Sequence, residues 1–453
     1  MSSPTTAVVG TGIVGIATAY YLAKQHGQGN ITLVDRSQPM TFTSAQSGEN
    51  YRNWWSHPTM VDFTNRSIAL LEEIARDSGN RINMTRRGYA LATRESDIDT
   101  LVAELRKGFG DKVDALLRFH TGGSASTYYP FEKPDWEGVP DGVDIVQNQD
   151  LIRSRFPSFD HAIRSIIHVR RGGDISGQQL GMYMLEYLRE AGASRVIGEV
   201  KSIAAGNGFR VEVSTTDGVK QLQADRIVNA AGPFAGKIAA MLGVDLPLQN
   251  VLQQKISFED SAGAVPRAQP FSIDLDPQLI DWTDEERAML RQDADAAWMA
   301  EKMPGSIHCR PDGGDGGKWI KLGWAFNNTP SEARWEPAFD DNFPDIVLRG
   351  ASRLTPALKT YYGRLPRGMH HYGGYYTMTK ENWPLIGPMG PEGAFMNCAL
   401  SGYGTMSACA AGELCAAWIA NAPRPAYADG FSMARYANAQ MMASLLDTDK
   451  GVL

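Results

Sequence analysis

Residues 7–36, AVVGTGIVGIATAYYLAKQHGQGNITLVDR, decide the fold that we expect for this chain. A short apolar run meets the glycine turn GTGIVG at residues 10–15, a helical pattern follows, and a second apolar run at residues 31–34 ends on Asp35. Strand, glycine turn, helix, strand and acid in this order form the dinucleotide-binding fingerprint in its full context. The stretch therefore predicts an α/β fold with a Rossmann-like nucleotide-binding domain.

Each residue of this fingerprint has a physical task. Gly10 permits the tight turn, Gly12 lets the backbone approach a pyrophosphate, and Gly15 lets the helix pack closely on the sheet. The N-terminus of the helix offers free N–H groups and the positive end of its dipole to the phosphates. Asp35 is placed to accept hydrogen bonds from the hydroxyls of an adenosine ribose. The pattern alone leaves open whether the dinucleotide is FAD or NAD.

Length and charge limit the remaining possibilities. A chain of 453 residues is too long for one ordinary core, so we expect two closely joined domains. The net charge of −7 provides no basic surface for nucleic acid or for an anionic membrane. The longest apolar stretch, residues 7–23, is interrupted by glycines, so we expect no membrane span. The N-terminal MSSPTT lacks a positively charged region, so we expect no secretory signal.

The four cysteines carry little functional information. They are Cys309, Cys398, Cys409 and Cys415, and none belongs to a CxxC pair or to a histidine set with zinc spacing. We therefore expect no metal site. So few cysteines, without a secretory signal, indicate free thiols in a reducing cytoplasm.

Two further segments have features of a cofactor site. The polar loop at residues 37–53 runs beside the cofactor in a nucleotide-binding fold, where Ser44 and Ser47 could donate hydrogen bonds; the alternative is a flexible surface loop. A strand that ends in NAAGP at residues 229–233 places small residues and backbone close to a cofactor.

Aromatic and charged residues elsewhere suggest where a substrate could bind. The adjacent Trp54 and Trp55 point in different directions if they lie in a loop, so at least one lines a cavity or an interface, or both belong to the core. Lys321 lies in the strand pattern KWIKLGW and is either an edge-strand charge or an ammonium aimed at a planar, electron-rich group. The acidic residues 281–303 begin with a capping box and predict a solvated helix or an oligomer contact.

Taken together, these motifs resemble those of the D-amino-acid oxidase/sarcosine oxidase family of FAD-dependent oxidoreductases. The matching stretches are VVGTGIVGIATAYYLA with Asp35, RIVNAAGPFAGKIAAMLG at residues 226–243, YYTMTKENWPLIGP at residues 375–388 and ALSGYGTMSACAAGELCAAWI at residues 399–419. The resemblance implies FAD as the cofactor. It also implies an FAD-binding domain built from residues 1–85, 160–245 and 366–453, interleaved with a β-sheet-based substrate domain from residues 86–159 and 246–365.

The resemblance implies a reaction as well. Enzymes of this family remove a hydride from the carbon next to an amine nitrogen and give an imine, while the protein supplies position and electrostatics. It implies that Lys321 lies near flavin N5 and assists the reaction with oxygen, because a fixed cation stabilises negative charge as it develops. The cofactor contacts that the motifs and the resemblance predict are Gly10, Gly12, Ile13, Val14, Gly15, Asp35, Arg36, Ser44, Ser47, Arg52, Val200, Ala231, Gly232, Gly402, Tyr403, Gly404, Thr405 and Met406.

Departures from the family pattern are informative. The cysteine that bonds covalently to flavin in sarcosine oxidases is replaced by Gly374, so we predict noncovalent FAD. Two positions of the clamp that holds a substrate carboxylate in those enzymes correspond to Ala325 and Met406, and its arginine corresponds to Trp55. A small carboxylate would lack its usual partners, which is costly in a buried site. We therefore expect a substrate that is larger or more apolar than sarcosine, aromatic or without a carboxylate.

The substrate contacts that we predict on this basis are Trp54, Trp55, Arg310, His371 and Tyr372. Three functions stay open. The first is a cytoplasmic amine or amino-acid oxidase that uses oxygen and yields hydrogen peroxide. The second is a dehydrogenase of an amine or a 2-hydroxy acid with another electron acceptor. The third is an assembly or scaffold protein whose FAD is structural and whose acidic residues 281–303 form a docking helix.

Overall fold

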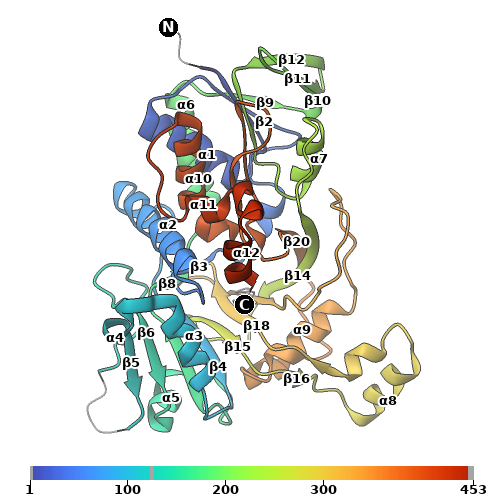
Figure 1. Ribbon diagram of the computed structural model, residues 1–453. Helices are drawn as coiled ribbons and strands as arrows, with labels where there is room; N and C mark the ends of the chain where they lie inside the picture. The colour runs from blue at the N-terminus through green and yellow to red at the C-terminus, as the bar shows by residue number, and fades with distance from the viewer. Residues whose placement is uncertain (1–3, 123–126, 447–453) are drawn as a thin grey trace.

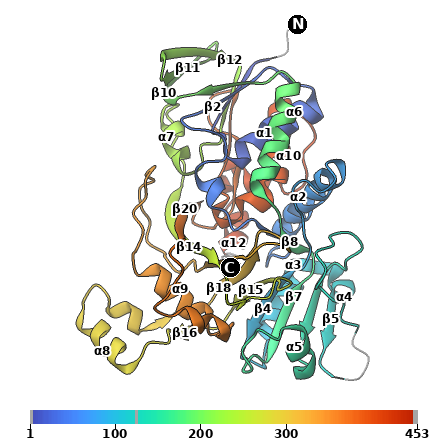
Figure 2. The same ribbon diagram turned by 180° about the vertical axis from the view of Figure 1, so that it is seen from behind.

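Two β-sheets with different surroundings form the body of the protein (Figure 1). The computed structural model describes residues 4–122 and 127–446, so the first three residues of the N-terminal MSSPTT lie outside the described residues. The two sheets have six and nine strands. In Figures 1 and 2 the smaller sheet and its helices occupy the upper part of the molecule, and the larger sheet occupies the lower part.

The six-stranded sheet has the strand order β21-β22-β13-β1-β2-β9. All of its pairs are parallel except the pair of β21 with β22. Its strands are β1 (Thr6–Val9), β2 (Ile31–Asp35), β9 (Ser194–Ile197), β13 (Arg226–Asn229), β21 (Leu385–Pro388) and β22 (Ala394–Cys398). The central pairing of β1 between β2 and β13 confirms the Rossmann-like prediction, and its register places Val8 beside Leu33 and Val228.

Strand alternation decides what covers each face of this sheet. Val8 and Leu33 belong to a core with the helices, whereas Val9 and Val34 belong to a second core with the three-stranded sheet and α7. The helices of the first core are α1 (Ile13–His26), α2 (Pro58–Asp77), α6 (Gly177–Glu190) and α10 (Gly404–Ala420). The elements of the second core are β10 (Glu199–Gly206), β11 (Gly208–Thr215), β12 (Gly218–Ala224) and α7 (Ala235–Ala240).

Helices α1 and α10 approach each other very closely because small residues meet where they cross. A Cβ atom added to Gly412 would lie 2.5 Å from the carbonyl carbon of Ala17. Both helices begin at the same edge of the sheet, where β1, β13 and β22 end, so their N-termini converge on one region. Helix α10 of the C-terminal region therefore packs directly on helix α1, which follows the glycine turn.

The nine-stranded sheet has the order β20-β14-β19-β18-β15-β4-β7-β6-β5. Its strands are β4 (Tyr89–Thr93), β5 (Leu117–His120), β6 (Val143–Val146), β7 (Ser165–Val169), β14 (Gln249–Glu259), β15 (Phe271–Asp274), β18 (Ile307–Asp312), β19 (Trp319–Gly323) and β20 (His370–Met378). β7 and β20 lie within segments that we had predicted for the FAD-binding domain. The chain therefore leaves the nine-stranded sheet after Val169 and after Met378, beyond the expected boundaries at residues 159 and 365.

Alternation along β14 and β19 also gives this sheet two different faces. Ile256, Phe258, Ile320 and Leu322 pack against α9 (Phe343–Ala351) in an apolar core. The residues that alternate with them along the two strands, which include Lys255 and Lys321, face toward the six-stranded sheet. The polar face of the larger sheet thus meets the edge at which α1 and α10 begin.

Short elements complete the chain. A two-stranded ribbon of β3 (Asn50–Arg52) and β8 (Gly172–Asp174) lies between the sheets, and β16 (Gln278–Leu279) pairs with β17 (Lys302–Met303). The other helices are α3 (Asp99–Phe109), α4 (Val113–Leu116), α5 (Gln149–Arg155), α8 (Asp284–Gln292), α11 (Ala428–Phe431) and α12 (Ala439–Leu446). The 3₁₀ turns are η1 (Thr43–Gln46), η2 (Gly110–Lys112), η3 (Gly232–Phe234), η4 (Ala297–Ala300), η5 (Pro356–Tyr361), η6 (Ser401–Tyr403) and η7 (Met433–Ala437).

The acidic segment differs in part from its prediction. The capping box of Thr283 and Glu286 is present, but α8 ends at Gln292 and does not continue to residue 303. The Asp293 carboxylate accepts a hydrogen bond from the backbone N–H of Asp295, which favours a turn over a further helical turn. Across residues 4–122 and 127–446, no helix has the length and apolarity that crossing a membrane requires.

The close crossing of α1 and α10 gives a prediction about stability. Gly412→Ala forces a methyl group against the backbone of Ala17, so we expect it to lower the free energy of unfolding by about 1–3 kcal/mol. Gly236→Ala in α7 is the matched control, because its added Cβ meets no atom within 4 Å. It should raise the free energy of unfolding by about 0.5–1 kcal/mol. Urea unfolding followed by circular dichroism measures both; equal effects of the two substitutions would contradict the packing described.

Candidate functional site

Two adjoining cavities lie where the helix N-termini face the larger sheet. The outer cavity is lined by the ends of β1 and β2, the start of β10 and the turn after β13. The inner cavity is lined by the start of α1, η1, the turn before α10 and strands of the nine-stranded sheet. Both cavities share Gly12, Ser44, Ala230 and Gly232, so they form one continuous, elongated space.

The glycine turn at the junction of the two cavities has no room for side chains. Gly10 has φ +109°, and a Cβ atom on it would lie 2.2 Å from the carbonyl oxygen of Ala230. A Cβ atom on Gly15 would lie 2.1 Å from the carbonyl oxygen of Gly10. Gly12 lines both cavities with bare backbone. The close packing at Gly10 and Gly15 thus fits the fingerprint, and the approach of Gly12 to a pyrophosphate stays a prediction.

Asp35 is held at the wall of the outer cavity by the turn itself. One carboxylate oxygen accepts hydrogen bonds from the backbone N–H of Thr11 at 2.6 Å and from its hydroxyl at 2.9 Å. The other oxygen accepts from the backbone N–H of Ser37 at 3.1 Å. Since a carboxylate offers about four lone-pair directions, acceptor capacity is left for a hydroxyl group in the cavity. Its position supports the predicted contact with an adenosine ribose.

The residues predicted as cofactor contacts gather on these two cavities, with one exception. Those on the outer cavity are Gly10, Gly12, Asp35, Arg36, Ser44, Val200, Ala231 and Gly232. Those on the inner cavity are Gly12, Ile13, Val14, Ser44, Ser47, Arg52, Gly232, Gly402, Tyr403, Gly404, Thr405 and Met406. Gly15 lines neither cavity, because its task is to let α1 pack against the turn.

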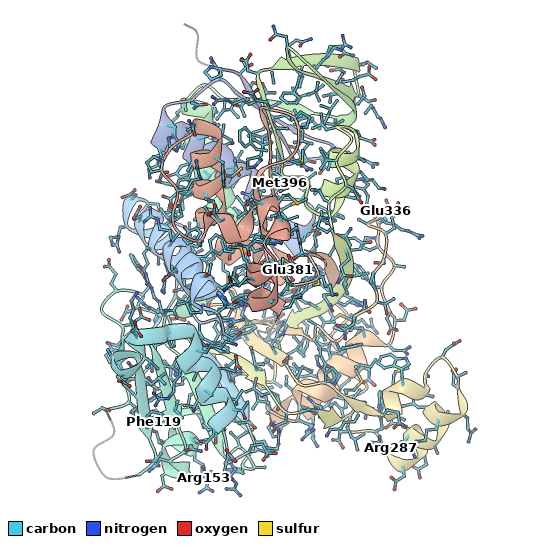
Figure 3. All side chains as sticks on the ribbon, in the orientation of Figure 1. Phe119, Arg153, Arg287, Glu336, Glu381 and Met396 are labelled. Carbon is cyan, nitrogen blue, oxygen red and sulfur yellow. The ribbon has the colours of Figure 1, made fainter. Side chains whose placement is uncertain are left out.

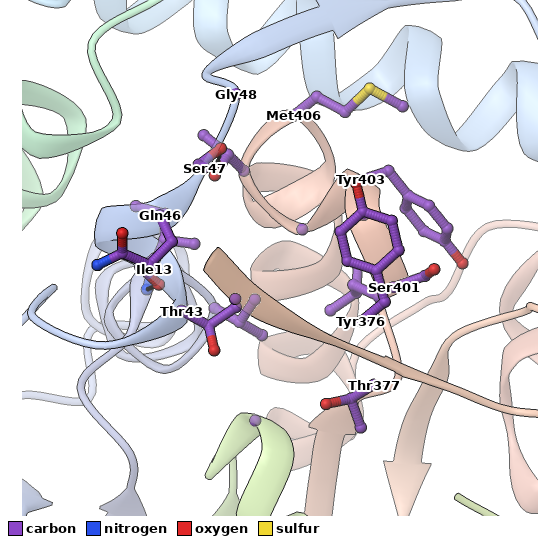
Figure 4. Close-up of a pocket in the computed structure, with 18 of the residues that line it drawn as sticks. Ile13, Thr43, Gln46, Ser47, Gly48, Tyr376, Thr377, Ser401, Tyr403 and Met406 are labelled. Carbon is purple, nitrogen blue, oxygen red and sulfur yellow. Dashed lines mark hydrogen bonds between the residues drawn. The ribbon is translucent and has the colours of Figure 1, made fainter. Parts of the chain in front are cut away.

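The inner cavity has polar groups on both of its sides (Figure 4). Thr43, Gln46 and Ser47 come from the loop after β2, and Tyr376, Ser401 and Tyr403 come from the opposite side. The Thr405 hydroxyl and the Ser47 hydroxyl lie 2.8 Å apart. Asn397 also lines this cavity. Its side-chain oxygen is buried and has no hydrogen-bond partner among the described residues. Buried polar atoms of this kind require a ligand or water, so the lining fits a long, polar dinucleotide.

Lys255 on β14 is a buried cation at the wall of the inner cavity. Its side chain is buried, with a relative exposure of 7%, and its Nζ lies 3.5 Å from the carbonyl oxygen of Gln46. Its Nζ also lies 5.8 Å from the centroid of the Tyr376 ring. No carboxylate of the described residues forms an ion pair with it. Burial, and then the nearby charge of Lys321, lower the pKa of Lys255 to about 8.

Glycine at position 323 makes room for this lysine. Gly323 pairs with Lys255 on one side and with His308 on the other. A Cβ atom on it would lie 2.3 Å from Nε2 of His308 and 3.1 Å from Cγ of Lys255. Burial, and then the charge of Lys255, lower the pKa of His308 to about 3, so its imidazole is neutral. The inner cavity therefore has a neutral histidine beside an ammonium group.

The structure places Lys321 behind the cavity wall. Its Nζ lies 2.9 Å from the Glu49 carboxylate and 3.3 Å from the Asp312 carboxylate. Arg310 contacts the same two carboxylates, at 3.6 Å and 3.1 Å. Glu49 lines the inner cavity and stands between it and Lys321. The role of Lys321 in the reaction with oxygen stays a prediction. Its ammonium is paired with two carboxylates in this structure.

The predicted tryptophan contacts lie behind Arg52. Both indoles are buried, and the Arg52 guanidinium lies over Trp54 at 5.5 Å and over Trp55 at 5.1 Å. Trp55 also meets Tyr403 edge-on, with ring centroids 4.9 Å apart. Arg52 and Tyr403 line the inner cavity, whereas the two tryptophans do not. The tryptophans therefore support cavity residues, which is the core alternative for this pair.

The three other residues predicted to contact substrate do not line the inner cavity either. Arg310 donates two hydrogen bonds to the carbonyl oxygen of Gly48 and is occupied there. Nε2 of His371 donates a hydrogen bond to the side-chain oxygen of Gln254 at 2.9 Å, on the face opposite to the cavity. Tyr372 pairs with Lys255 across the sheet, and burial is the main cause that raises the pKa of its hydroxyl. Sequence spacing could not show these positions, because they depend on the register of β14, β18 and β20.

Several cavity residues were missed by the sequence analysis. They are Tyr89, Lys255, Phe271, His308 and Tyr376. A signal existed for Lys255, since Lys255 and Ser257 alternate with the apolar Ile256 and Phe258 in the strand. For Tyr89 and Phe271 there was none, because apolar positions in strands predict core and cavity walls equally well.

The residues relevant to covalent attachment fit a free cofactor. Gly374 lines the inner cavity at the place where the resemblance puts the flavin-linking cysteine of sarcosine oxidases. Cys398 lines the same cavity, and burial raises the pKa of its thiol to about 12. A thiol that stays protonated is a poor nucleophile. Noncovalent binding stays a prediction that these two residues support.

Comparison with known proteins gives the family of the chain. A profile of the family described as FAD dependent oxidoreductase matches residues 5–418, so the chain belongs to this family, DAO, and its cofactor is FAD. Human mitochondrial dimethylglycine dehydrogenase is 23% identical over 434 residues, which are 93% of this chain and 43% of that protein. The chain thus spans less than half the length of the dimethylglycine dehydrogenases that it matches.

Solved structures agree on the fold. L-proline dehydrogenase from P. horikoshii superposes with a TM-score of 0.70 and 17% identity, covering 96% of this chain and 98% of that one. Glycine oxidase from Geobacillus kaustophilus gives a TM-score of 0.68 and 16% identity, covering 95% and 98%. At these identities the likeness concerns the fold alone.

The position of Asp35 gives a prediction about FAD affinity. Asp35→Ala removes an ionised acceptor at the wall of the outer cavity, so we expect the Kd for FAD to rise about 10- to 100-fold. Titration of the apoprotein with FAD measures this, and the melting temperature of the apoprotein controls for the lost bonds to Thr11. An unchanged Kd in a folded variant would contradict a ribose contact by Asp35.

Proposed function

We propose that this protein oxidises the C–N bond of an amine or an amino acid and passes the electrons to oxygen. The substrate loses a hydride and a proton and becomes an imine, which water hydrolyses; oxygen takes up two electrons and two protons and becomes hydrogen peroxide. The observation that carries the proposal is the uncompensated ammonium of Lys255 on the wall of a cavity that the FAD-binding turn also lines. Relatives and neighbours named for dimethylglycine, glycine and iminodiacetate support the substrate class.

The residues of the inner cavity have separate tasks in this proposal. When bound, FAD supplies the hydride acceptor. The rings of Tyr89, Phe271 and Tyr376 exclude water, which strengthens electrostatic interactions inside the cavity. The neutral imidazole of His308 takes no charge near neutral pH. Lys255 holds a positive charge that stabilises the negative charge developing on oxygen.

The substrate is proposed to be larger or more apolar than sarcosine. Met406, which stands in place of a family clamp residue, lines the inner cavity with an apolar side chain. Arg52 and Lys255 nevertheless line the same cavity and offer positive charge to a carboxylate. Amines with and without a carboxylate therefore both belong in the test.

A second candidate function keeps the same first half-reaction but uses another electron acceptor. It is favoured by the likeness to proteins named dimethylglycine dehydrogenase and L-proline dehydrogenase. The two candidates differ only in how the reduced protein is reoxidised. Oxygen consumption and dye reduction by the same preparation separate them.

Anaerobic mixing with a panel of substrates tests the proposal. The panel contains N-methylated amino acids, D- and L-amino acids, simple amines and 2-hydroxy acids. We expect one of the amine classes to bleach the flavin absorbance near 450 nm, and we expect air to restore it with formation of hydrogen peroxide. Bleaching by 2-hydroxy acids alone, or by no compound at all, would contradict amine oxidation.

Two lysine variants test which cation assists the reaction with oxygen. Lys255→Met should leave anaerobic reduction largely intact and slow reoxidation by oxygen about 100-fold. The matched control is Lys321→Met, because Lys321 lies on the same face of the sheet but is paired with Glu49 and Asp312. We expect it to keep reoxidation within about threefold, since its ammonium is held by these two carboxylates behind the cavity wall. The reverse result would assign the role to Lys321, as the family resemblance predicts.

The same reaction should depend on pH in a defined direction. Lys255 is charged below its pKa of about 8 and neutral above it, so reoxidation should slow as the pH rises through about 8. Lys255→Met should lose this inflection. In Lys321→Met it should move to higher pH, because the like charge that lowers the pKa of Lys255 is gone. Stopped-flow measurements of the reoxidation rate across pH 6–10 compare the wild type with the two variants. The same inflection in all three proteins would contradict the role proposed for Lys255.

A further inference from the structure

A segment of the substrate domain reaches over to the nucleotide-binding turn. We call residues 327–336 the strap; they follow β19 and precede α9. In Figures 1 and 2 this orange segment rises from the region of α9 along β14 and β20 toward α7. Gln253 donates a hydrogen bond to the carbonyl oxygen of Asn327 at 2.7 Å, and Ser331 donates its N–H to the carbonyl oxygen of Asn250 at 2.8 Å. The strap is therefore fixed along β14.

The tip of the strap inserts an aromatic residue at the outer cavity. Ala333 and Trp335 line this cavity together with Asp35 and Arg36. The Trp335 ring stacks on Phe234 with centroids 4.7 Å apart and an interplanar angle of 19°. The next residue, Glu336, is exposed and lies at the outer edge of the molecule in Figure 3. The strap therefore presents its one large ring inward and its charge outward.

Trp335 is held from several elements of the other domain. Phe42 packs against it with centroids 4.8 Å apart, and the Arg36 guanidinium lies over its ring at 4.9 Å. Arg36 directly follows the ribose acid of the fingerprint, and Phe234 belongs to the turn after β13. Cation–π and aromatic pairs of this kind are each worth about 0.5–1.5 kcal/mol, which is enough to hold a surface segment in place.

The ion pair at the tip contributes less. Glu332 lies 2.9 Å from Lys237 of α7, but both side chains are well exposed. Exposed ion pairs stabilise a structure by about 0–1 kcal/mol. Among the side chains at the tip, Trp335 therefore contributes more than Glu332 to the docking of the strap.

We infer that the strap is the cover of the adenosine half of FAD and that Trp335 forms an aromatic wall against the purine ring. The outer cavity contains the acid that the fingerprint places beside the adenosine ribose, and Trp335 lines that same cavity. Aromatic side chains stack on nucleic-acid bases regardless of sequence, because every base has a π-face. Release of FAD then requires the strap to break its contacts with Phe234 and Arg36. Retention of the cofactor is thus controlled by a segment of the substrate domain.

The release rate of FAD tests this inference without any measurement of activity. The FAD-loaded protein is diluted into an excess of an apoflavodoxin-type acceptor, and the change in flavin fluorescence gives the rate. We expect Trp335→Ala to release FAD at least about fivefold faster. This factor corresponds to the lower end of the free energy that one base–aromatic contact contributes. Trp335→Phe should keep most of the retention. Glu332→Gln should change the rate less than about twofold, because its ion pair is exposed.

Trp136→Ala is the matched control, since this indole is held under Arg76 far from the outer cavity. It should release FAD at the wild-type rate. A release rate of folded Trp335→Ala within twofold of the wild type would overturn the inference, and so would an equal acceleration in Trp136→Ala.

Proteolysis of the wild-type protein gives a second measurement that needs no variant. Trypsin cleaves after arginine, and Arg334 is exposed beside Trp335. We expect saturating FAD to slow cleavage after Arg334, because bound cofactor holds Trp335 and the strap in place. Equal cleavage rates at this bond in the apoprotein and the FAD-loaded protein would overturn the inference. Neither measurement depends on the substrate, so both are independent of the proposed function.

Discussion

The contact of the Gly10 turn with the backbone after β13 is the constraint on which the site depends. A side chain at Gly10 would meet the carbonyl oxygen of Ala230 at 2.2 Å, and one at Gly15 would meet Gly10 at 2.1 Å. Three pieces of backbone therefore touch without side chains between them. This contact sets where α1 begins, and the Gly412 crossing sets α10 beside it. Two helix N-termini are thus aimed at one elongated cavity, which suits the phosphates of FAD.

The second half of the site depends on a different kind of constraint. The nine-stranded sheet brings an apolar face to α9 and a polar face to the cavity, so any charge on the polar face needs a partner. Lys321 and Arg310 have theirs in Glu49 and Asp312. Lys255 is buried without a carboxylate partner among the described residues, and its pKa is lowered to about 8. A protein retains such a costly group where a ligand or a developing charge compensates it.

The sequence predicted the parts of the structure that depend on local pattern. The turn at residues 10–15 and Asp35 at the end of the second strand lie within one continuous stretch, and their positions follow from spacing alone. The parts that it did not predict depend on pairing between distant strands. Lys255 reaches the cavity because Gly323 lies opposite to it, and that register is set by strands far apart in the chain. The strap was missed for the same reason, since nothing local connects Trp335 with Phe234.

A crystal structure of the FAD-loaded protein would show directly whether Lys255 is the cation beside the flavin while Lys321 stays in its ion pairs. We expect the Nζ of Lys255 to lie about 3 Å from a flavin atom, or from one water that bridges to it. Lys321 should keep its contacts with Glu49 and Asp312. If Lys321 instead leaves these carboxylates and contacts the flavin, with Lys255 turned away, then Lys255 does not have this role.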